Sequence, residues 1–137
     1  MKRLLFLVTI FVFFTNLYGE KLDRKTIQSA EFLSEVASSL NKQLPMMIDK
    51  ETRLDSVYGT KKNLVFKYTL VNISYGDYTK KQIKDALYDN IKNSVCTNPK
   101  TVIFPKNGIN INYDYYSKRG KFMAEITISP KDCGYRE

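Results

Sequence analysis

The spacing of apolar residues divides the chain after residue 20 into helical and extended segments. Between residues 25 and 44, apolar positions recur every three or four residues, as on one face of a helix. Asp23 or Thr26 can cap the start of this helix, and Pro45 should end it because the residue before a proline avoids helical geometry. The pattern predicts one amphipathic helix, whose apolar positions are Ile27, Ala30, Leu33, Ala37, Leu40 and Leu44.

The apolar spacing then changes to every second residue, which is typical of strands. Residues 46–54 predict a first strand with Asp49 and Arg53 on the same side, followed by a turn around Gly59. Residues 63–73 predict a second strand. It is rich in β-branched and aromatic residues on both faces, so we expect it in the middle of a sheet. The two strands should pair as a hairpin.

A second helix is predicted from the capping box that Thr79 and Gln82 can form, in which each side chain bonds the other residue's backbone N–H. Apolar residues at helical spacing follow, and the helix should end near Cys96, before Pro99. The short apolar piece at residues 101–104 is compatible with a strand or an irregular arm. The segment therefore predicts one helix followed by a connection.

The last third of the chain predicts a hairpin of residues 109–116 and 122–128, with a turn around Gly120. In each strand, apolar side chains alternate with mostly polar ones. This alternation is typical of an antiparallel sheet that is covered on one side only. The polar side would expose Asn110, Asn112, Asp114, Tyr116 and Glu125, whereas Ile109, Ile111, Tyr113 and Tyr115 would face the core.

The order of elements is therefore α-β-β-α-β-β, which predicts the α+β class. We expect an antiparallel sheet of four to five strands with both helices on one face. The length suits a single domain, residues 20–137. The sequence does not specify the strand order or the oligomeric state.

The N-terminus has the pattern of a secretory signal peptide over residues 1–19. Lys2 and Arg3 precede an apolar run from residue 4 to residue 14, and Gly19 is a small residue at the expected cleavage position. The competing interpretation is an uncleaved inner-membrane anchor formed by residues 4–19, although a spanning helix needs roughly 20 apolar residues. The leader contains no cysteine, which excludes a lipoprotein. We therefore expect a secreted or periplasmic protein.

Charge and cysteine content fit an exported domain. The chain of 137 residues has 22 basic and 14 acidic residues, a net charge of +8, but its basic residues are dispersed rather than clustered as in a nucleic-acid-binding tail. In an oxidising compartment, the two cysteines, Cys96 and Cys133, can form a disulfide. Chain entropy predicts about 4 kcal/mol of stabilisation from such a bridge.

The residue types exclude several kinds of chemistry. The chain has no histidine, so Ser-His-Asp and Cys-His catalysis are absent, and a disulfide would remove the thiols that commonly bind zinc. We therefore expect no metal and no cofactor. Four charged residues share one predicted strand face and could bind a partner, act as glycosidase carboxylates, or merely be solvated; they are Asp49, Glu51, Arg53 and Asp55.

A second candidate surface is the polar side of the last hairpin. Tyr116 is its exposed aromatic residue, with Asn112 and Asp114 beside it. Tyrosines on a basic sheet can stack on sugars or on single-stranded nucleic acid. Because the protein is expected outside the cytoplasm, nucleic acid is not an expected partner.

Several segments resemble small exported bacterial proteins of unassigned activity. The similarity covers Leu44–Asp49, Glu51–Asp55 and a C-terminal region that includes Cys96, Gly108, Gly120 and Cys133. It implies a periplasmic, disulfide-closed α+β domain and no catalytic residue. In size and in its disulfide, the chain also resembles the pilotins of type II secretion, which are lipoproteins, unlike a protein with this leader.

These observations favour a non-enzymatic binding or accessory protein of the bacterial envelope. Its partner would be an envelope protein or a cell-wall polymer. Two alternatives remain open at this point. One is an inhibitor or immunity protein of an envelope hydrolase, and the other is an enzyme that acts on cell-wall glycan through the strand carboxylates.

Overall fold

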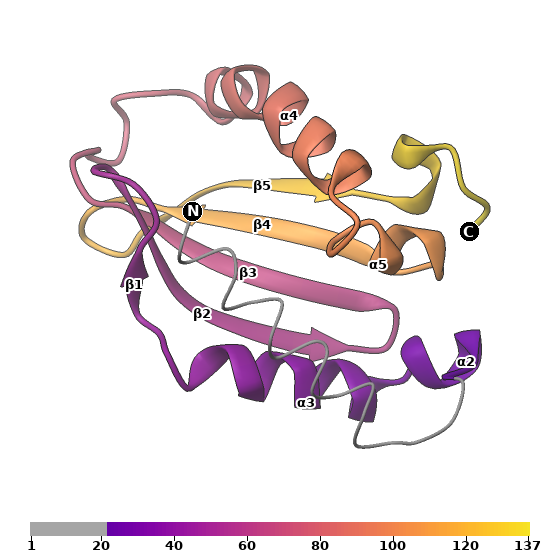
Figure 1. Cartoon of the computed structure of the whole chain (residues 1–137). Coiled ribbons are helices and arrows are strands. Elements are labelled where there is room, and N and C mark those ends of the chain that lie inside the picture. The colour runs from indigo at the N-terminus through magenta and orange to yellow at the C-terminus, as the bar shows by residue number, and fades with distance from the viewer. Residues whose placement is uncertain (1–21) are drawn as a thin grey trace.

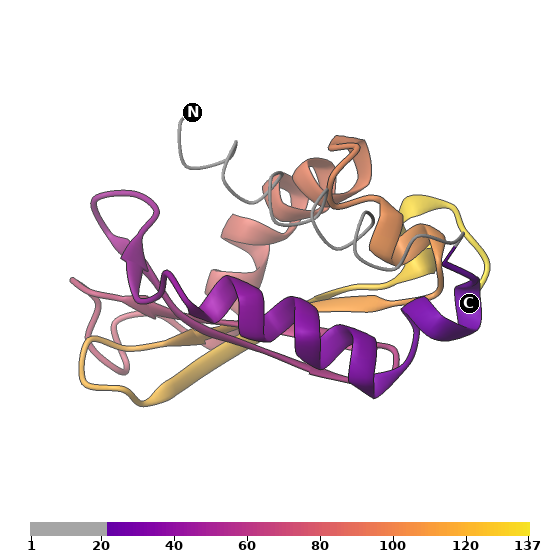
Figure 2. The same ribbon diagram turned by 60° about the horizontal axis from the view of Figure 1, so that its bottom comes forward.

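The computed structural model describes residues 22–137, so the expected signal peptide and its cleavage site lie outside the described residues. These residues form one five-stranded sheet with the helices packed on one of its faces (Figures 1 and 2). The α+β class is confirmed. The helices of the described residues are α2 (Arg24–Ile27), α3 (Ala30–Asn41), α4 (Lys80–Thr97), α5 (Ile103–Lys106) and the short 3₁₀ helix η1 (Pro130–Cys133).

The strands follow the order of the sequence across the sheet, β1-β2-β3-β4-β5. Their bounds are β1 (Met46–Met47), β2 (Thr52–Thr60), β3 (Asn63–Leu70), β4 (Asn110–Tyr116) and β5 (Phe122–Ile128). All neighbours are antiparallel except β3 and β4, which are parallel. The expectation of a wholly antiparallel sheet is therefore wrong at this pair. The long connection through α4 returns the chain to the end of the sheet where β3 began, and parallel strands require such a crossover.

The first predicted helix is divided into two. Asp23 caps α2 by accepting a hydrogen bond of 2.7 Å from the backbone N–H of Thr26. Ser29 then starts α3, because its hydroxyl accepts a hydrogen bond of 3.1 Å from the N–H of Phe32. The apolar spacing continues through both helices and so concealed this second N-cap. Ile27, Leu33 and Val36 are buried on the side that packs against the sheet.

The first predicted strand is in fact a tight turn between two strands. Asp49 bends the chain after β1, because its Oδ1 accepts hydrogen bonds from the N–H groups of Glu51 (2.8 Å) and Thr52 (2.7 Å). Asp side chains commonly stabilise turns in this way. The chain then pairs back on itself, with Met46 opposite Leu54. The sheet therefore has five strands.

The turn expected around Gly59 lies slightly later in the chain. Gly59 is within β2, where α3 crosses so closely that an added Cβ would lie 2.3 Å from the carbonyl carbon of Leu33. Lys62, with a φ of 62°, makes the reversal into β3 instead. Gly59 is thus required by helix–sheet packing and not by turn geometry.

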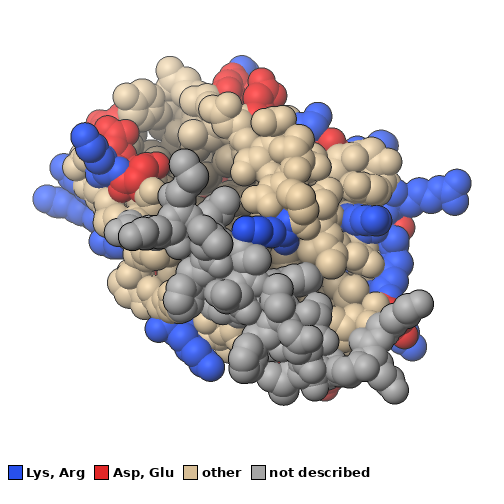
Figure 3. All heavy atoms as spheres, in the orientation of Figure 1, with Lys and Arg blue, Asp and Glu red and all other residues tan. Residues whose placement is uncertain are grey.

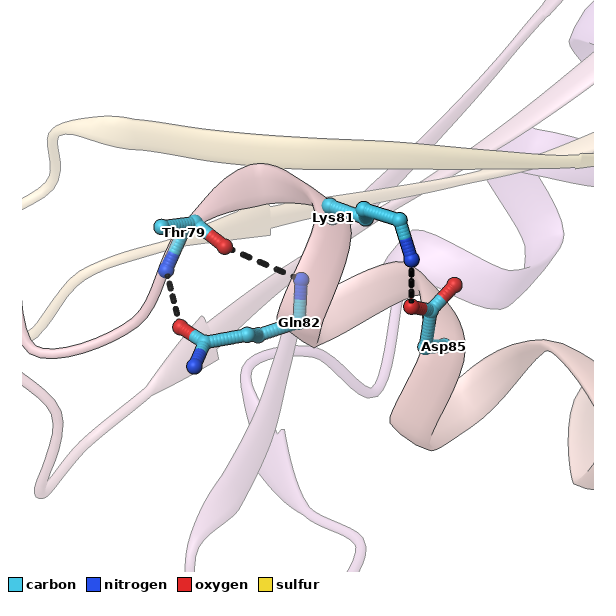
Figure 4. Close-up of polar contacts among 4 residues, drawn as sticks. All are labelled: Thr79, Lys81, Gln82 and Asp85. Carbon is cyan, nitrogen blue, oxygen red and sulfur yellow. Dashed lines mark hydrogen bonds and ion pairs between the residues drawn. The ribbon is translucent and has the colours of Figure 1, made fainter.

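The later elements agree more closely with expectation. Thr79 and Gln82 form the predicted capping box at the start of α4 (Figure 4). The connection at residues 101–104, expected to be a strand or an irregular arm, leads into α5. Cys96 and Cys133 form the expected disulfide, with Cα atoms 5.2 Å apart, and it joins the end of α4 to η1.

The main core lies between the sheet and the helices. Leu33, Leu64, Ile111 and Ile128 are fully enclosed there. Tyr113 and Tyr115 face this side, as predicted, and form a stack with Tyr68 in which ring centroids are 5.4–5.9 Å apart. Burial raises the pKa of Tyr115 to about 12, with a smaller contribution from the negative charge of Asp49. These tyrosines therefore remain neutral packing residues.

Candidate functional site

The second face of the sheet is covered by no helix of residues 22–137, as Figure 2 shows by the position of α3 and α4 on the same side. We call this surface the open face. Because strand side chains alternate, the neighbours of the core residues point toward it. The open face includes Arg53, Asp55, Tyr58, Lys67, Thr69, Asn112, Asp114, Tyr116, Glu125 and Thr127.

Two carboxyl groups meet on the β4–β5 side of the open face. Asp114 of β4 stands directly opposite Glu125 of β5. The Asp114 side chain is buried, with 7% exposure, and its Oδ1 has no hydrogen-bond partner among the described residues. Burial, followed by the interaction with Glu125, raises the pKa of Asp114 to about 7, while the charge of Lys67 partly opposes this rise. Asp114 can therefore keep its proton near neutral pH beside Glu125.

A lysine lies between two aromatic rings next to this carboxyl pair. The Lys67 ammonium is 5.4 Å from the ring centroid of Tyr58 and 5.9 Å from that of Tyr116. Tyr116 in turn meets the edge of the Phe122 ring at 5.7 Å. These contacts restrict the Lys67 side chain, because a cation is attracted to the face of an aromatic ring. The open face thus presents a positioned cation.

Arg53 and Asp55 form the part of the open face on β2. The Arg53 Nε donates a 2.5 Å hydrogen bond to Asp55 Oδ1, and the Thr69 hydroxyl donates another of 2.5 Å to Asp55 Oδ2. A bulge between Leu54 and Ser56 places Asp55 on the same side as Arg53. Both carboxylate oxygens are therefore occupied by donors.

The four charged residues expected on one strand face are divided by the fold. Arg53 and Asp55 are together on β2, whereas Asp49 and Glu51 are exposed in the turn before it. Asp49 serves that turn through its hydrogen bonds to the backbone. The prediction of a common face for all four is wrong, because the turn interrupts the strand alternation on which it depended.

Asn112 and Asp114 have the predicted side of the sheet but not the predicted exposure. Asn112 is 8% exposed, and its Oδ1 accepts a 2.8 Å hydrogen bond from the Thr127 hydroxyl. Its Nδ2 donates to Asn63 Oδ1 at 3.3 Å. Both residues are buried on the open face, so the expectation that they face solvent is wrong. Tyr116 remains partly exposed.

Sequence reasoning missed Lys67 and Tyr58 as members of this surface. Neither belongs to a motif, and the parallel register that sets Lys67 opposite Asp114 is a tertiary feature. The sequence does offer one signal for Lys67, because it is a lysine within a strand whose other residues are mostly apolar. Among residues 22–137, no group of three or more acidic, cysteine or histidine residues is arranged to hold a metal. Nor does this part of the chain contain a helix long and apolar enough to cross a membrane.

Comparison with known proteins gives the chain a family. The sequence pattern of the domain of unknown function DUF8479 matches residues 26–124. The chain belongs to the DUF8479 family. It is also similar to Protein K of Escherichia coli, with 31% identity over 103 residues that make up 72% of this chain and 53% of that protein. The chain thus spans about half the length of this curated relative.

The DUF8479 match includes α3 and the first four strands, and it ends within β5 before Glu125. Most of the open face therefore belongs to the region that the family shares. Of the carboxyl pair, Asp114 lies within the matched region, whereas Glu125 lies just beyond its end.

Three solved structures share the fold. A protein of Pseudomonas aeruginosa described as secreted has a TM-score of 0.67 and 15% identity, covering 83% of this chain and 99% of that one. The pilotin EpsS of the Vibrio vulnificus type 2 secretion system has a TM-score of 0.65 and 12% identity, with 82% and 97% coverage. The type II secretion pilotin AspS of Vibrio cholerae has a TM-score of 0.61 and 14% identity, with 80% and 95% coverage. At these identities the likeness establishes the fold alone.

Proposed function

We propose that this DUF8479 protein is an exported, non-enzymatic accessory protein of the bacterial envelope that binds a protein partner through its open face. The similarity in fold to a secreted protein and to two secretion pilotins supports this role. The leader pattern at residues 1–19 and the Cys96–Cys133 disulfide support export. The resemblance to small exported bacterial proteins points in the same direction.

The observation that carries the proposal is the Lys67 cation held beside the Asp114–Glu125 carboxyl pair, on the face that no helix of residues 22–137 covers. A charged group that is already positioned before binding loses little side-chain entropy when a partner arrives. Partly buried aromatic rings around a charge are also typical of binding hot spots. Arg53 and Asp55 would extend the same contact surface on β2.

The alternative of a glycan-acting enzyme is supported less well by the fold. That hypothesis placed two strand carboxylates on one face, from among Asp49, Glu51 and Asp55, and the fold puts Asp49 and Glu51 in a turn and Asp55 on β2. A partner that is itself a hydrolase would make this protein an inhibitor, and the partner's identity decides between that role and an assembly role.

The proposal is tested by crosslinking in cells that export the full chain with a C-terminal tag. The wild type should recover one stoichiometric envelope protein, and Lys67→Glu should lose it because the substitution reverses the positioned charge. Lys42→Glu, an equal change at an exposed lysine at the end of α3, is the matched control. Retention of the partner by Lys67→Glu would contradict binding through the open face, and recovery with cell-wall glycan alone would contradict a protein partner.

A further inference from the structure

A groove of about 570 Å³ runs between α4 and β5 and adjoins the open face at Glu125 and Thr127. Its α4 wall is formed by Lys80, Lys84, Asp85, Tyr88 and Asp89, and its other wall is residues 125–127 of β5. Glu125 and Thr127 point to the open face and Ile126 to the core. Three consecutive strand residues with alternating side chains can border one groove only along the edge of the strand. The groove therefore follows the free edge of β5.

The outer edge of β5 is not paired with another strand among the described residues. β5 is the last strand of the sheet, with β4 as its only partner among the described residues. In an edge strand, half of the backbone N–H and C=O groups point away from the sheet and can pair with another chain. No backbone hydrogen bond joins residues 122–128 to α4 or to any other element of the described chain besides β4. By contrast, the opposite edge ends in β1, which has only two residues.

The charges along the groove have a direction. α4 runs alongside β5 in the same sense (Figure 1). Lys80 is near the start of β5, with its ammonium 5.8 Å from the Phe122 ring. Tyr88 is near the end of β5, because its hydroxyl donates a 2.8 Å hydrogen bond to Asp132 of η1. The groove thus has Lys80 and Lys84 toward the start of β5 and Asp85 and Asp89 toward its end, with Glu125 on the β5 wall between them.

Lys81 does not add to this gradient. Lys81 does not border the groove, but it forms an ion pair with Asp85, which does, as Figure 4 shows for the pair. The lysines of the groove wall, Lys80 and Lys84, are four residues apart and therefore lie along one face of α4. The basic end of the groove is therefore set by these two residues.

We propose that this groove binds an extended segment of a partner protein, which adds to the sheet as a sixth strand antiparallel to β5. The bound segment would have basic residues toward its N-terminal end, beside Asp89, and acidic residues toward its C-terminal end, beside Lys80 and Lys84. Its backbone would bond the free edge, in the manner of β-strand addition. A second copy of this chain is a poorer occupant, because its own β5 carries α4 alongside and the two helices would meet.

The test uses the full domain and a synthetic peptide of about seven residues, which matches the seven residues of β5. The peptide has alternating valine and threonine in its centre, lysines at its N-terminal end and glutamates at its C-terminal end. Binding is followed by NMR shifts and hydrogen-exchange protection of the backbone amides. We expect protection of amides within residues 122–128, and no binding of the same peptide when its backbone is N-methylated at alternate positions.

Charge-swapped variants test the direction of the bound strand. Lys84→Glu should weaken binding about tenfold, because it reverses one charge at the basic end of the groove. The double variant Lys84→Glu with Asp89→Lys should instead prefer a peptide with its charged ends exchanged. Lys42→Glu is the control, and both changed residues of the groove are exposed, so folding should be preserved.

Four results would overturn the proposal. They are no protection of the β5 amides at about 1 mM peptide, equal binding of the N-methylated peptide, no change of preference in the double variant, and concentration-dependent protection of β5 without peptide, which would indicate self-association. None of these results depends on Lys67 or on the partner of the open face. The groove can therefore fail while the proposed function stands, and the reverse also holds.

Discussion

The two faces of the sheet are made from the same strands but are stabilised differently. On the helix-covered face, α3 and α4 enclose Leu33, Ile111 and Ile126 in a close-packed apolar core. On the open face, no helix of the described chain excludes water, yet Asn112 and Asp114 are buried by the side chains beside them. The comparison teaches that burial need not mean packing under a helix. On the open face it produces positioned polar groups rather than a core.

Charge follows the same division. Lysines, arginines and carboxylates are spread around the rim of the side that carries the helices, without one dominant patch in the part of Figure 3 drawn in colour. The open face, in contrast, brings together Lys67, Asp114 and Glu125 on three neighbouring strands. The net charge of +8 is therefore a poorer guide to binding than this local arrangement.

The largest expected effect is on the helix-covered side, at the disulfide. Replacing Cys96 and Cys133 by serine should cost about 4 kcal/mol of unfolding free energy, because the reduced chain regains loop entropy in the unfolded state. The melting temperature should fall by more than about 10 °C. Reduction of the wild type should have the same effect, and an unchanged melting curve after verified reduction would contradict the prediction.

Gly59→Ala should have the next largest effect. The new Cβ would lie 2.3 Å from the backbone of Leu33, so α3 would have to move away from β2. We expect a loss of about 3 kcal/mol in urea denaturation. Gly120→Ala is the control: it has open space around it but a φ of 82°, and should cost about 1 kcal/mol. An equal loss at both positions would show that the helix–sheet contact does not demand glycine.

On the open face, the contribution to folding stability should depend more on pH than on side-chain packing. The pKa of Asp114 is raised from 3.8 to about 7 in the folded state, so the folded protein binds this proton more tightly than the unfolded chain. Stability should be fully present below about pH 4 and should fall by about 1 kcal/mol or more as pH rises toward 7.

Asp114→Asn should flatten this dependence, as measured by melting temperature between about pH 4 and pH 8. Asp85→Asn is the control, because Asp85 is exposed and paired with Lys81. Parallel curves for the wild type and Asp114→Asn would show that this carboxyl does not titrate in that range.

The smallest expected effect on stability is that of Lys67→Met, about 1 kcal/mol or less, because the stem is kept and only the cation–π contacts are lost. The more informative effect of Lys67→Met is on the pKa of Asp114. The positive charge of Lys67 lowers the pKa of Asp114, so its removal should raise that pKa further. Carboxyl-carbon NMR titration measures this shift. An unchanged titration midpoint of Asp114 would show that the charge of Lys67 does not influence the carboxyl pair.

Features that depend on nearby residues could be predicted from the sequence. The sequence predicts the capping box of Thr79 and Gln82, which spans four residues, and the alternation that directs Tyr113 and Tyr115 to the core. The turn at Asp49 is equally local, but its flanking residues also fit a strand, so alternation alone predicts one continuous strand there. The second N-cap at Ser29 was concealed for a similar reason, because the apolar stripe continues through it.

By itself, the sequence determined the α+β class, the two main helices, the C-terminal hairpin and the residues able to form the disulfide. These depend on periodicity, capping and turns, which act over a few residues. Only the tertiary structure decided the parallel pairing of β3 with β4, the enclosure of Asp114, the position of Lys67 and the groove beside β5. Each of these requires segments far apart in the chain to meet in one register, and that register is set by the packing of the whole sheet.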